Sequence, residues 1–148
     1  MSGPFHSVSG GGDSYMDAHL DNPQKENTMR ELTSHKINPA NDVLSVTAID
    51  GPGPGGASHA YNITQPGKEG FPTQIVFQNG AISEVGVNGV THEALLAILI
   101  DRMEGFQSGA FANAYNEAAL GFMRAAQNVL LDRTRERMSR GVEGTHKV

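Results

Sequence analysis

The sequence predicts an α+β fold, a small antiparallel β-meander followed by a C-terminal antiparallel helical hairpin that oligomerises through its helices. Between residues 42 and 90, short β-branched segments are separated by turns rich in glycine and proline, which is typical of a meander. From residue 91, apolar residues recur at helical spacing. The 148 residues fit one domain in three parts: a mobile arm (1–41), a sheet region (42–90), and a hairpin with a ligand-binding tail (91–148).

The arm contains Gly10–Gly12 and Asn22–Pro23, has few apolar residues and shows no sustained periodicity. The sheet begins after it. Its expected strands are β-branched or alternate between polar and apolar residues, and they cover Val43–Ile49, Ala57–Thr64, Thr73–Gln78 and Ile82–Val87. Asn79-Gly80 predicts a hairpin turn before the last of these strands, because both residues tolerate positive φ.

Two helices are expected next. Thr91 is a suitable N-cap, and Glu93 places negative charge in the first turn, where it is favourable. The glycines of Gly105–Gly109 end this helix, and a second helix runs from about Phe111 to Arg140. Gly141 then provides the C-cap.

The second helix would be about 45 Å long, and the first only about half of that. It has two apolar rows. One contains Phe111, Tyr115, Ala118, Phe122, Ala125 and Val129, and the other contains Leu120, Met123, Ala126 and Leu130. A single chain has too little else to bury the Leu120 row, so we expect a homo-oligomer in which helices of different subunits pack together. The alternative is that the sheet covers this row.

Positive charge is concentrated at the end of the second helix. Arg133, Arg137 and Arg140 are spaced four and three apart, which places them on one face. Their guanidinium groups suit a phosphate or pyrophosphate. Alternatively, they are solvated cations that complement the helix dipole. The net charge of −5 argues against a nucleic-acid polymer as partner, so an anionic ligand would be small.

Other motifs argue against catalysis. The glycine-rich run Gly51–Gly56 matches a dinucleotide fingerprint only formally, because a strand rather than a helix follows it. The six histidines show no helical metal spacing, and no serine lies in a nucleophile context. We therefore expect no catalytic residue, metal or cofactor. The absence of cysteine suits a reducing cytosol, and no secretory signal or membrane span is expected.

Two polar or aromatic positions near the hairpin turn are further candidates. Phe106 either plugs the turn or offers a ring on which a base stacks. Asn116 either caps the turn or pairs with a base edge or ribose hydroxyl. Asn116 and Arg133 are 17 residues apart, about 25 Å along one helix. If Phe106, Asn116, Arg133 and Arg137 serve one site, the arginines must come from an antiparallel neighbouring subunit.

Several segments resemble phage proteins of the anti-Thoeris sponge family, Thoeris anti-defence protein one, whose hairpin is shared with phage anti-CBASS sponges. They lie within residues 74–148 and include Ile75–Gly80, Glu84–Thr91, Leu95–Ile98, Asp101-Arg102, Gly105–Gly109, Arg133-Thr134 and Gly141–His146.

The resemblance implies an oligomer, commonly a hexamer, that binds cyclic nucleotide immune signals in the cytoplasm of the infected bacterial host without degrading them. Such ligands include glycocyclic ADP-ribose isomers and, in some members, cyclic di- or trinucleotides. By position, Phe106 resembles the family's base-stacking aromatic and Asn116 its hydrogen-bonding asparagine. Arg133 and Arg137 resemble its phosphate-binding arginines.

The chain departs from the family at Ala114 and Tyr115, where arginine and glutamate are usual, and at Arg124-Ala125, where an acidic pair is common. Ligand preference can therefore differ. Two other functions remain open. One is a non-catalytic interaction or virion protein that uses the hairpin only for assembly. The other is a hydrolase with His59 or His92 as base, which no nucleophile or metal constellation supports.

Overall fold

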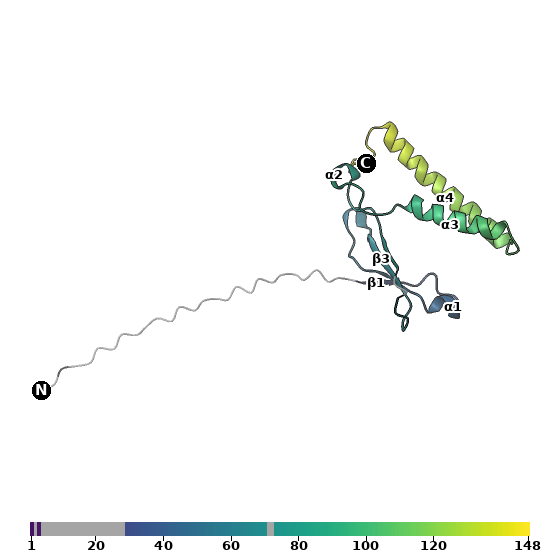
Figure 1. Cartoon of the computed structure of the whole chain (residues 1–148). Helices are drawn as coiled ribbons and strands as arrows, with labels where there is room; N and C mark the ends of the chain where they lie inside the picture. Colours follow the sequence, from purple (N-terminus) through teal and green to yellow (C-terminus); the bar gives the residue numbers. More distant parts are fainter. Residues whose placement is uncertain (2, 4–28, 71–72) are drawn as a thin grey trace.

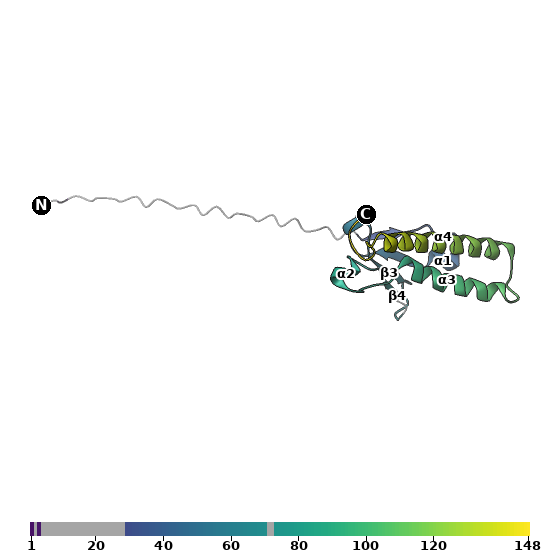
Figure 2. The ribbon, with the colours of Figure 1, turned by 90° about the horizontal axis from the view of Figure 1, so that it is seen from above.

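The computed structural model describes residues 1, 3, 29–70 and 73–148. Its sheet, the short helix α2 (Ile82–Val85) and the hairpin of α3 (His92–Gln107) and α4 (Ala114–Ser139) follow one another in the chain. The hairpin projects away from the sheet, and the C-terminus returns to lie beside α2 (Figure 1). Seen from above, α3 and α4 run side by side (Figure 2). The α+β prediction is confirmed.

The sheet is an antiparallel meander with the strand order β1-β2-β3-β4. Its strands are β1 (Arg30–Leu32), β2 (Ser45–Ala48), β3 (Ala60–Thr64) and β4 (Thr73–Val76). A short 3-10 turn, η1 (Pro54–Gly56), lies between β2 and β3. Val46 is paired with Leu32 and Ile63, and Tyr61 is paired with Ile75. Because paired residues share a face, these apolar side chains form one continuous apolar surface.

The predicted strand over Ile82–Val87 is wrong, because α2 forms there and β1 is the fourth strand. After Phe77 the chain makes a closed loop instead of a hairpin and returns to pair with Phe77 at Val90 in parallel. The side chains of Gln78 and Asn88 close the neck of this loop. Gln78 bonds the Gly86 carbonyl and the Asn88 amide, each at 2.9 Å, and Asn88 bonds both backbone groups of Asn79. These side chains replace the ladder of a β-hairpin.

Part of the predicted arm is structured. Leu32 in β1 pairs with Val46, and α1 (Pro39–Asp42) follows. Asn38 caps α1, since its side-chain oxygen accepts hydrogen bonds from the amides of Ala40 and Asn41 at 2.9 and 3.1 Å. The prediction that residues up to 28 are mobile concerns positions that lie outside the described residues, apart from Met1 and Gly3.

The hairpin is confirmed with small shifts at its ends. Thr91 caps α3 by accepting a 3.2 Å hydrogen bond from the Ala94 amide. Helix α4 begins at Ala114 rather than Phe111, because the Asn113 side chain caps it. At its other end Gly141 has a φ of +68°, and the amides of Gly141 and Val142 bond the carbonyls of Met138 and Arg137 at 3.0 Å. This is a Schellman motif, and it turns the chain back towards α2.

The apolar core is small. Among the described residues, the buried apolar side chains are Ala48, Ala81, Ile100 and Leu120. Leu120, Met123 and Leu130 are buried or half-buried, so most of the row expected to lack cover is covered within one chain. The other row is the uncovered one: Phe111, Tyr115, Phe122 and Val129 are 73%, 89%, 77% and 68% exposed. The prediction exchanged the two rows: the row expected to pack within the chain is the exposed one, and association of subunits through this face stays a prediction.

No helix in the described ranges is long and apolar enough to cross a membrane.

Candidate functional site

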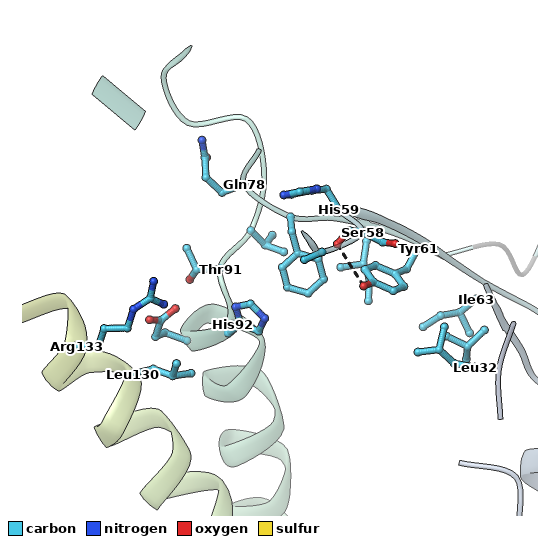
Figure 3. A pocket seen from close by; sticks show the side chains of 16 residues that line it. Leu32, Ser58, His59, Tyr61, Ile63, Gln78, Thr91, His92, Leu130 and Arg133 are labelled. Carbon is cyan, nitrogen blue, oxygen red and sulfur yellow. Dashed lines mark hydrogen bonds between the residues drawn. The ribbon is translucent and has the colours of Figure 1, made fainter. Parts of the chain in front are cut away.

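Two cavities meet at the C-terminal half of α4. The first, which we call the aromatic cavity, has a volume of about 500 Å³ and lies between the apolar face of the sheet and the start of α3 (Figure 3). The second, the polar cavity, has a volume of about 720 Å³ and is bordered by α4, the loop around Gly80 and the tail 143–148. Their shared lining residues are His59, Gln78, Thr91, Glu93 and Arg133.

Arg133 is the arginine that borders both cavities. Figure 3 shows its side chain beside Thr91 at their common border. No hydrogen bond or ion pair joins its guanidinium to any residue in the described part of the chain. An unpaired guanidinium keeps all of its donors for a ligand, and its planar fork matches the oxygens of a phosphate. Arg133 therefore borders both cavities with its donors free, and its role in anion binding stays a prediction.

Arg137, one turn further along α4, also lines the polar cavity but is fully engaged. Its Nε donates to the Glu143 carboxylate at 2.9 Å, and its two terminal nitrogens donate to the carbonyls of Lys147, Val142 and Thr145 at 2.9, 3.1 and 2.9 Å. Only 15% of the side chain is exposed. A phosphate would reach this guanidinium only by replacing tail oxygens.

The tail is fastened at a second point. The Gly144 carbonyl accepts hydrogen bonds from the amide of Ser83 at 3.1 Å and from its hydroxyl at 2.7 Å. His146 lies 3.3 Å from the Glu84 carboxylate. Residues 143–148 thus link the end of α4 to α2, and they line the polar cavity opposite Arg133.

Phe106 and Asn116 lie together at the far end of the hairpin. The Phe106 ring meets the Phe111 ring edge to face at 6.3 Å, and the Arg102 guanidinium carbon lies 4.9 Å from its centroid. The Asn116 side chain donates to the Phe111 carbonyl at 3.3 Å. Neither residue lines either cavity. One chain therefore brings together Phe106 with Asn116 and Arg133 with Arg137, but not the two pairs.

The sequence reasoning did not predict that three ring residues, Tyr61, Phe77 and His92, would line one cavity; it considered His92 only as a base. Phe77 lies between the other two rings: Tyr61 meets it edge-on at 5.7 Å, and His92 is tilted by 34° to it at 5.1 Å. The alternation in Thr73–Gln78 did signal a strand with one apolar face. It did not show that the start of α3 would carry His92 across that face, since this depends on the loop 79–89.

Asp50 fixes the loop beside the aromatic cavity. Its carboxylate accepts hydrogen bonds from the backbone amides of His59 and Ala60 at 2.8 and 3.1 Å. These two bonds lower the pKa of Asp50 below its ordinary value, because they favour the charged form. Gly53 packs against the His59 ring, and a Cβ at Gly53 would lie only 3.0 Å from its Cε1 atom. The loop therefore holds His59 in place at the cavity border.

Comparison with known proteins finds sequence similarity to a phage anti-defence protein. No protein-family model matches the chain. It is 39% identical over 93 residues to Thoeris anti-defense 1 of Bacillus phage SBSphiJ7, and the match covers 63% of this chain. The chain spans 66% of that relative's length. This identity supports the anti-Thoeris family for the chain and a phage anti-defence role.

Proposed function

We propose that the protein binds and sequesters cyclic nucleotide immune signals without degrading them, with glycocyclic ADP-ribose isomers as first candidates and cyclic di- or trinucleotides as further ones. The observation that carries this proposal is the unpaired guanidinium of Arg133 at the border of two cavities. The 39% identical relative, named for its action against Thoeris defence, supports it. The site of action would be the cytoplasm of the infected host.

Phosphate recognition centres on Arg133 in this proposal. A cation that has no partner in the free protein gives up no existing contact when an anion binds, and preorganised charge-assisted bonds are worth about 1.5–3 kcal/mol. Arg137 lies in the same cavity and contributes positive potential beneath the tail. A direct bond from Arg137 to phosphate would require exchange of its contacts with Glu143 and the tail carbonyls.

The hairpin tip supplies the rest of the site from another subunit. Phe106 would stack on a base, and Asn116 would bond a base edge or ribose hydroxyl. Helix α4 has 26 residues, about 39 Å, and Asn116 and Arg133 lie towards its opposite ends. Antiparallel packing of two α4 helices through the Phe122 face would bring a partner's tip to Arg133. Such a contact is symmetric and joins two subunits. We propose a hexamer, in which a second interface would join three of these pairs.

Sequestration needs slow release rather than turnover. Within the described ranges, no group of three histidine or acidic residues is arranged to hold a metal ion. The test is therefore to titrate the purified protein calorimetrically with glycocyclic ADP-ribose isomers and with cyclic di- and trinucleotides. The complex is then denatured by heat, and the released ligand is chromatographed. We expect nanomolar binding and recovery of the intact ligand. A cleaved product would identify an enzyme instead.

One observation favours a second function. The open face of α4, with Phe122 77% exposed, is also what a pure assembly protein would show. In that case the hairpin would only join subunits, and Arg133 would be a solvated cation. Lack of binding to every cyclic nucleotide tested, together with a stable oligomer, would favour this function.

A further inference from the structure

We propose that the aromatic cavity is a base-binding subsite, which takes the planar nucleobase of a nucleotide whose phosphate is held by Arg133. This inference rests on the proposed function and extends it to residues of the sheet, in addition to Phe106 of the neighbouring subunit. The volume of the aromatic cavity, about 500 Å³, falls within the range of roughly 300–1,000 Å³ that is typical of small-molecule sites.

The walls of the cavity suit a flat apolar group. Its floor is the sheet face that carries Tyr61, Ile63, Ile75 and Phe77. The ring of His92, at the start of α3, lies 5.1 Å from the Phe77 ring. Figure 3 shows His92 at the start of α3, facing the ring-bearing side of the sheet. Aromatic faces bind any nucleobase by stacking, because every base has a π-face. The His92 side is the accessible one, because His92 is exposed whereas Phe77 is half-buried.

The mouth of the cavity carries polar groups that lack partners. Glu93 lines both cavities, and no hydrogen bond or ion pair involves its carboxylate anywhere in the described ranges. A free carboxylate accepts a hydrogen bond from the exocyclic amine of a base, as it does from cytosine in DNA recognition. Arg133 and Glu93 thus offer a donor for phosphate and an acceptor for a base amine at the same border.

His59 adds a second hydrogen-bonding group. Neither of its ring nitrogens has a hydrogen-bond partner among the described residues, and of the two only Nδ1 is buried. Nδ1 lies 3.9 Å from the Asp50 carboxylate, too far for a hydrogen bond. The accessible Nε2 can donate or accept a hydrogen bond beside the cavity, according to the tautomer. An apolar side chain from a neighbouring subunit would leave this nitrogen, Glu93 and Arg133 without partners, so a nucleotide fits the cavity better.

The test compares adenosine monophosphate with ribose 5-phosphate, which carries the same phosphate but no base. Binding of both to the full-length protein is measured by NMR titration, and transferred NOEs are sought between adenine H8 or H2 and the His92 ring. Two variants remove the stacking surface: His92→Ala at an exposed helix start, and Phe77→Leu, which keeps most of the volume. His35→Ala is the matched control, since its ring bonds the Leu44 carbonyl and lines neither cavity.

We expect adenosine monophosphate to bind about tenfold more tightly than ribose 5-phosphate, the lower part of the range for one stacked base. His92→Ala and Phe77→Leu should abolish this ratio, whereas His35→Ala should preserve it. An unchanged ratio in both cavity variants would overturn the subsite. So would loss of subunit association in His92→Ala with the ratio intact, because a partner side chain would then occupy the cavity.

A parallel titration with the cyclic nucleotide panel separates the two proposals. Tight binding of a cyclic nucleotide that His92→Ala does not weaken would retain the sequestration function and reject the base subsite. Failure of the wild-type protein to bind any cyclic nucleotide would reject sequestration. In that case the NOE from adenine to His92 would still decide whether the cavity takes a base.

Discussion

Arg133 and Arg137 lie one helical turn apart on α4 and border the same cavity, yet only one of them is free. Arg137 makes four bonds to the tail, whereas Arg133 has no partner within the described ranges. Arginines that look equivalent in the sequence therefore have different tasks. The Arg133 guanidinium keeps its donors free, whereas Arg137 holds the tail that forms one wall of the polar cavity.

Arg133→Ala should weaken binding of the cyclic nucleotide by about ten- to a hundredfold, because it removes a charge-assisted contact worth about 1.5–3 kcal/mol. Assembly and melting temperature should not change, since Arg133 has no partner to lose among the described residues. Arg135→Ala is the control: the Arg135 side chain is 67% exposed and pairs with Asp132 on the same helix. Calorimetry of both variants tests this. If Arg133→Ala and Arg135→Ala bind the ligand with equal affinity, Arg133 does not contact the ligand.

Arg137→Ala should loosen the tail. We expect the backbone amides of Val142, Thr145 and Lys147 to exchange hydrogen faster, and the protein to lose about 1.5–3 kcal/mol of stability, because a largely buried set of charge-assisted bonds is removed. Hydrogen-exchange mass spectrometry measures the first effect and urea unfolding the second. Arg140→Ala is the control, as Arg140 is more exposed and its tail contact is to Val148. Unchanged tail protection would contradict this role.

Phe122→Glu should dissociate the oligomer, because it places a charge in the centre of the open apolar face of α4, where Phe122 is 77% exposed. Asn128→Glu, an equally charged change at another exposed position of α4, should not. Sedimentation velocity over a range of concentrations gives the outcome. If Phe122→Glu remains fully assembled, the subunits pack through another surface.

A mixing experiment tests whether the site is shared. Phe106→Ala and Arg133→Ala should each bind weakly alone. Co-refolded mixtures should regain tight sites, since a Phe106 from one variant can meet an Arg133 from the other. Recovery should reach roughly a quarter of the wild-type capacity if equal subunits mix at random. A mixture of Arg133→Ala with the double variant Arg133→Ala,Phe106→Ala contains no Arg133 and should regain no binding. Recovery in that mixture would show that the regained binding does not come from pairing Phe106 of one subunit with Arg133 of another.

Asp50 should make the free energy of unfolding fall at acidic pH. Its pKa is lowered in the folded protein by the backbone amides of His59 and Ala60. Its contribution is therefore complete above the ordinary carboxyl pKa of about 4 and is lost as the pH falls through the lower native pKa. Urea unfolding between pH 7 and pH 2 should show this loss, and Asp50→Asn should reduce it. An identical acid profile in the variant would assign the acid sensitivity to other carboxylates.

The helices could be predicted from sequence because their signals are local. Thr91 and Gly141 mark the start of α3 and the end of α4 without reference to the rest of the fold. The break between the helices was placed less well, because α3 continues through Gly105 and Phe106 to Gln107. The segment after Gln78 could not, since Asn79-Gly80 is a strong hairpin signal that tertiary contacts overrule. The Ser83–Gly144 bonds join residues 61 positions apart, and no local pattern encodes them.

The same distinction applies to the site. The spacing of Arg133 and Arg137 predicted a common face, and the structure gives them a common cavity. The spacing could not show that backbone carbonyls of the tail would accept hydrogen bonds from the Arg137 guanidinium. Nor could it show which apolar row of α4 faces α3, because both rows have helical periodicity and the choice depends on how the hairpin is rotated against its neighbour.

The small apolar core should make the stability of the protein depend on its concentration. With Ala48, Ala81, Ile100 and Leu120 as the buried apolar side chains of the described part, an isolated chain has little to offset the entropy of folding. Folding should then be coupled to association, and the melting temperature should rise with protein concentration. Early in synthesis, scarce copies would remain open to host proteases. Under the proposed function, sequestration would begin abruptly, once expression passes the concentration at which subunits associate.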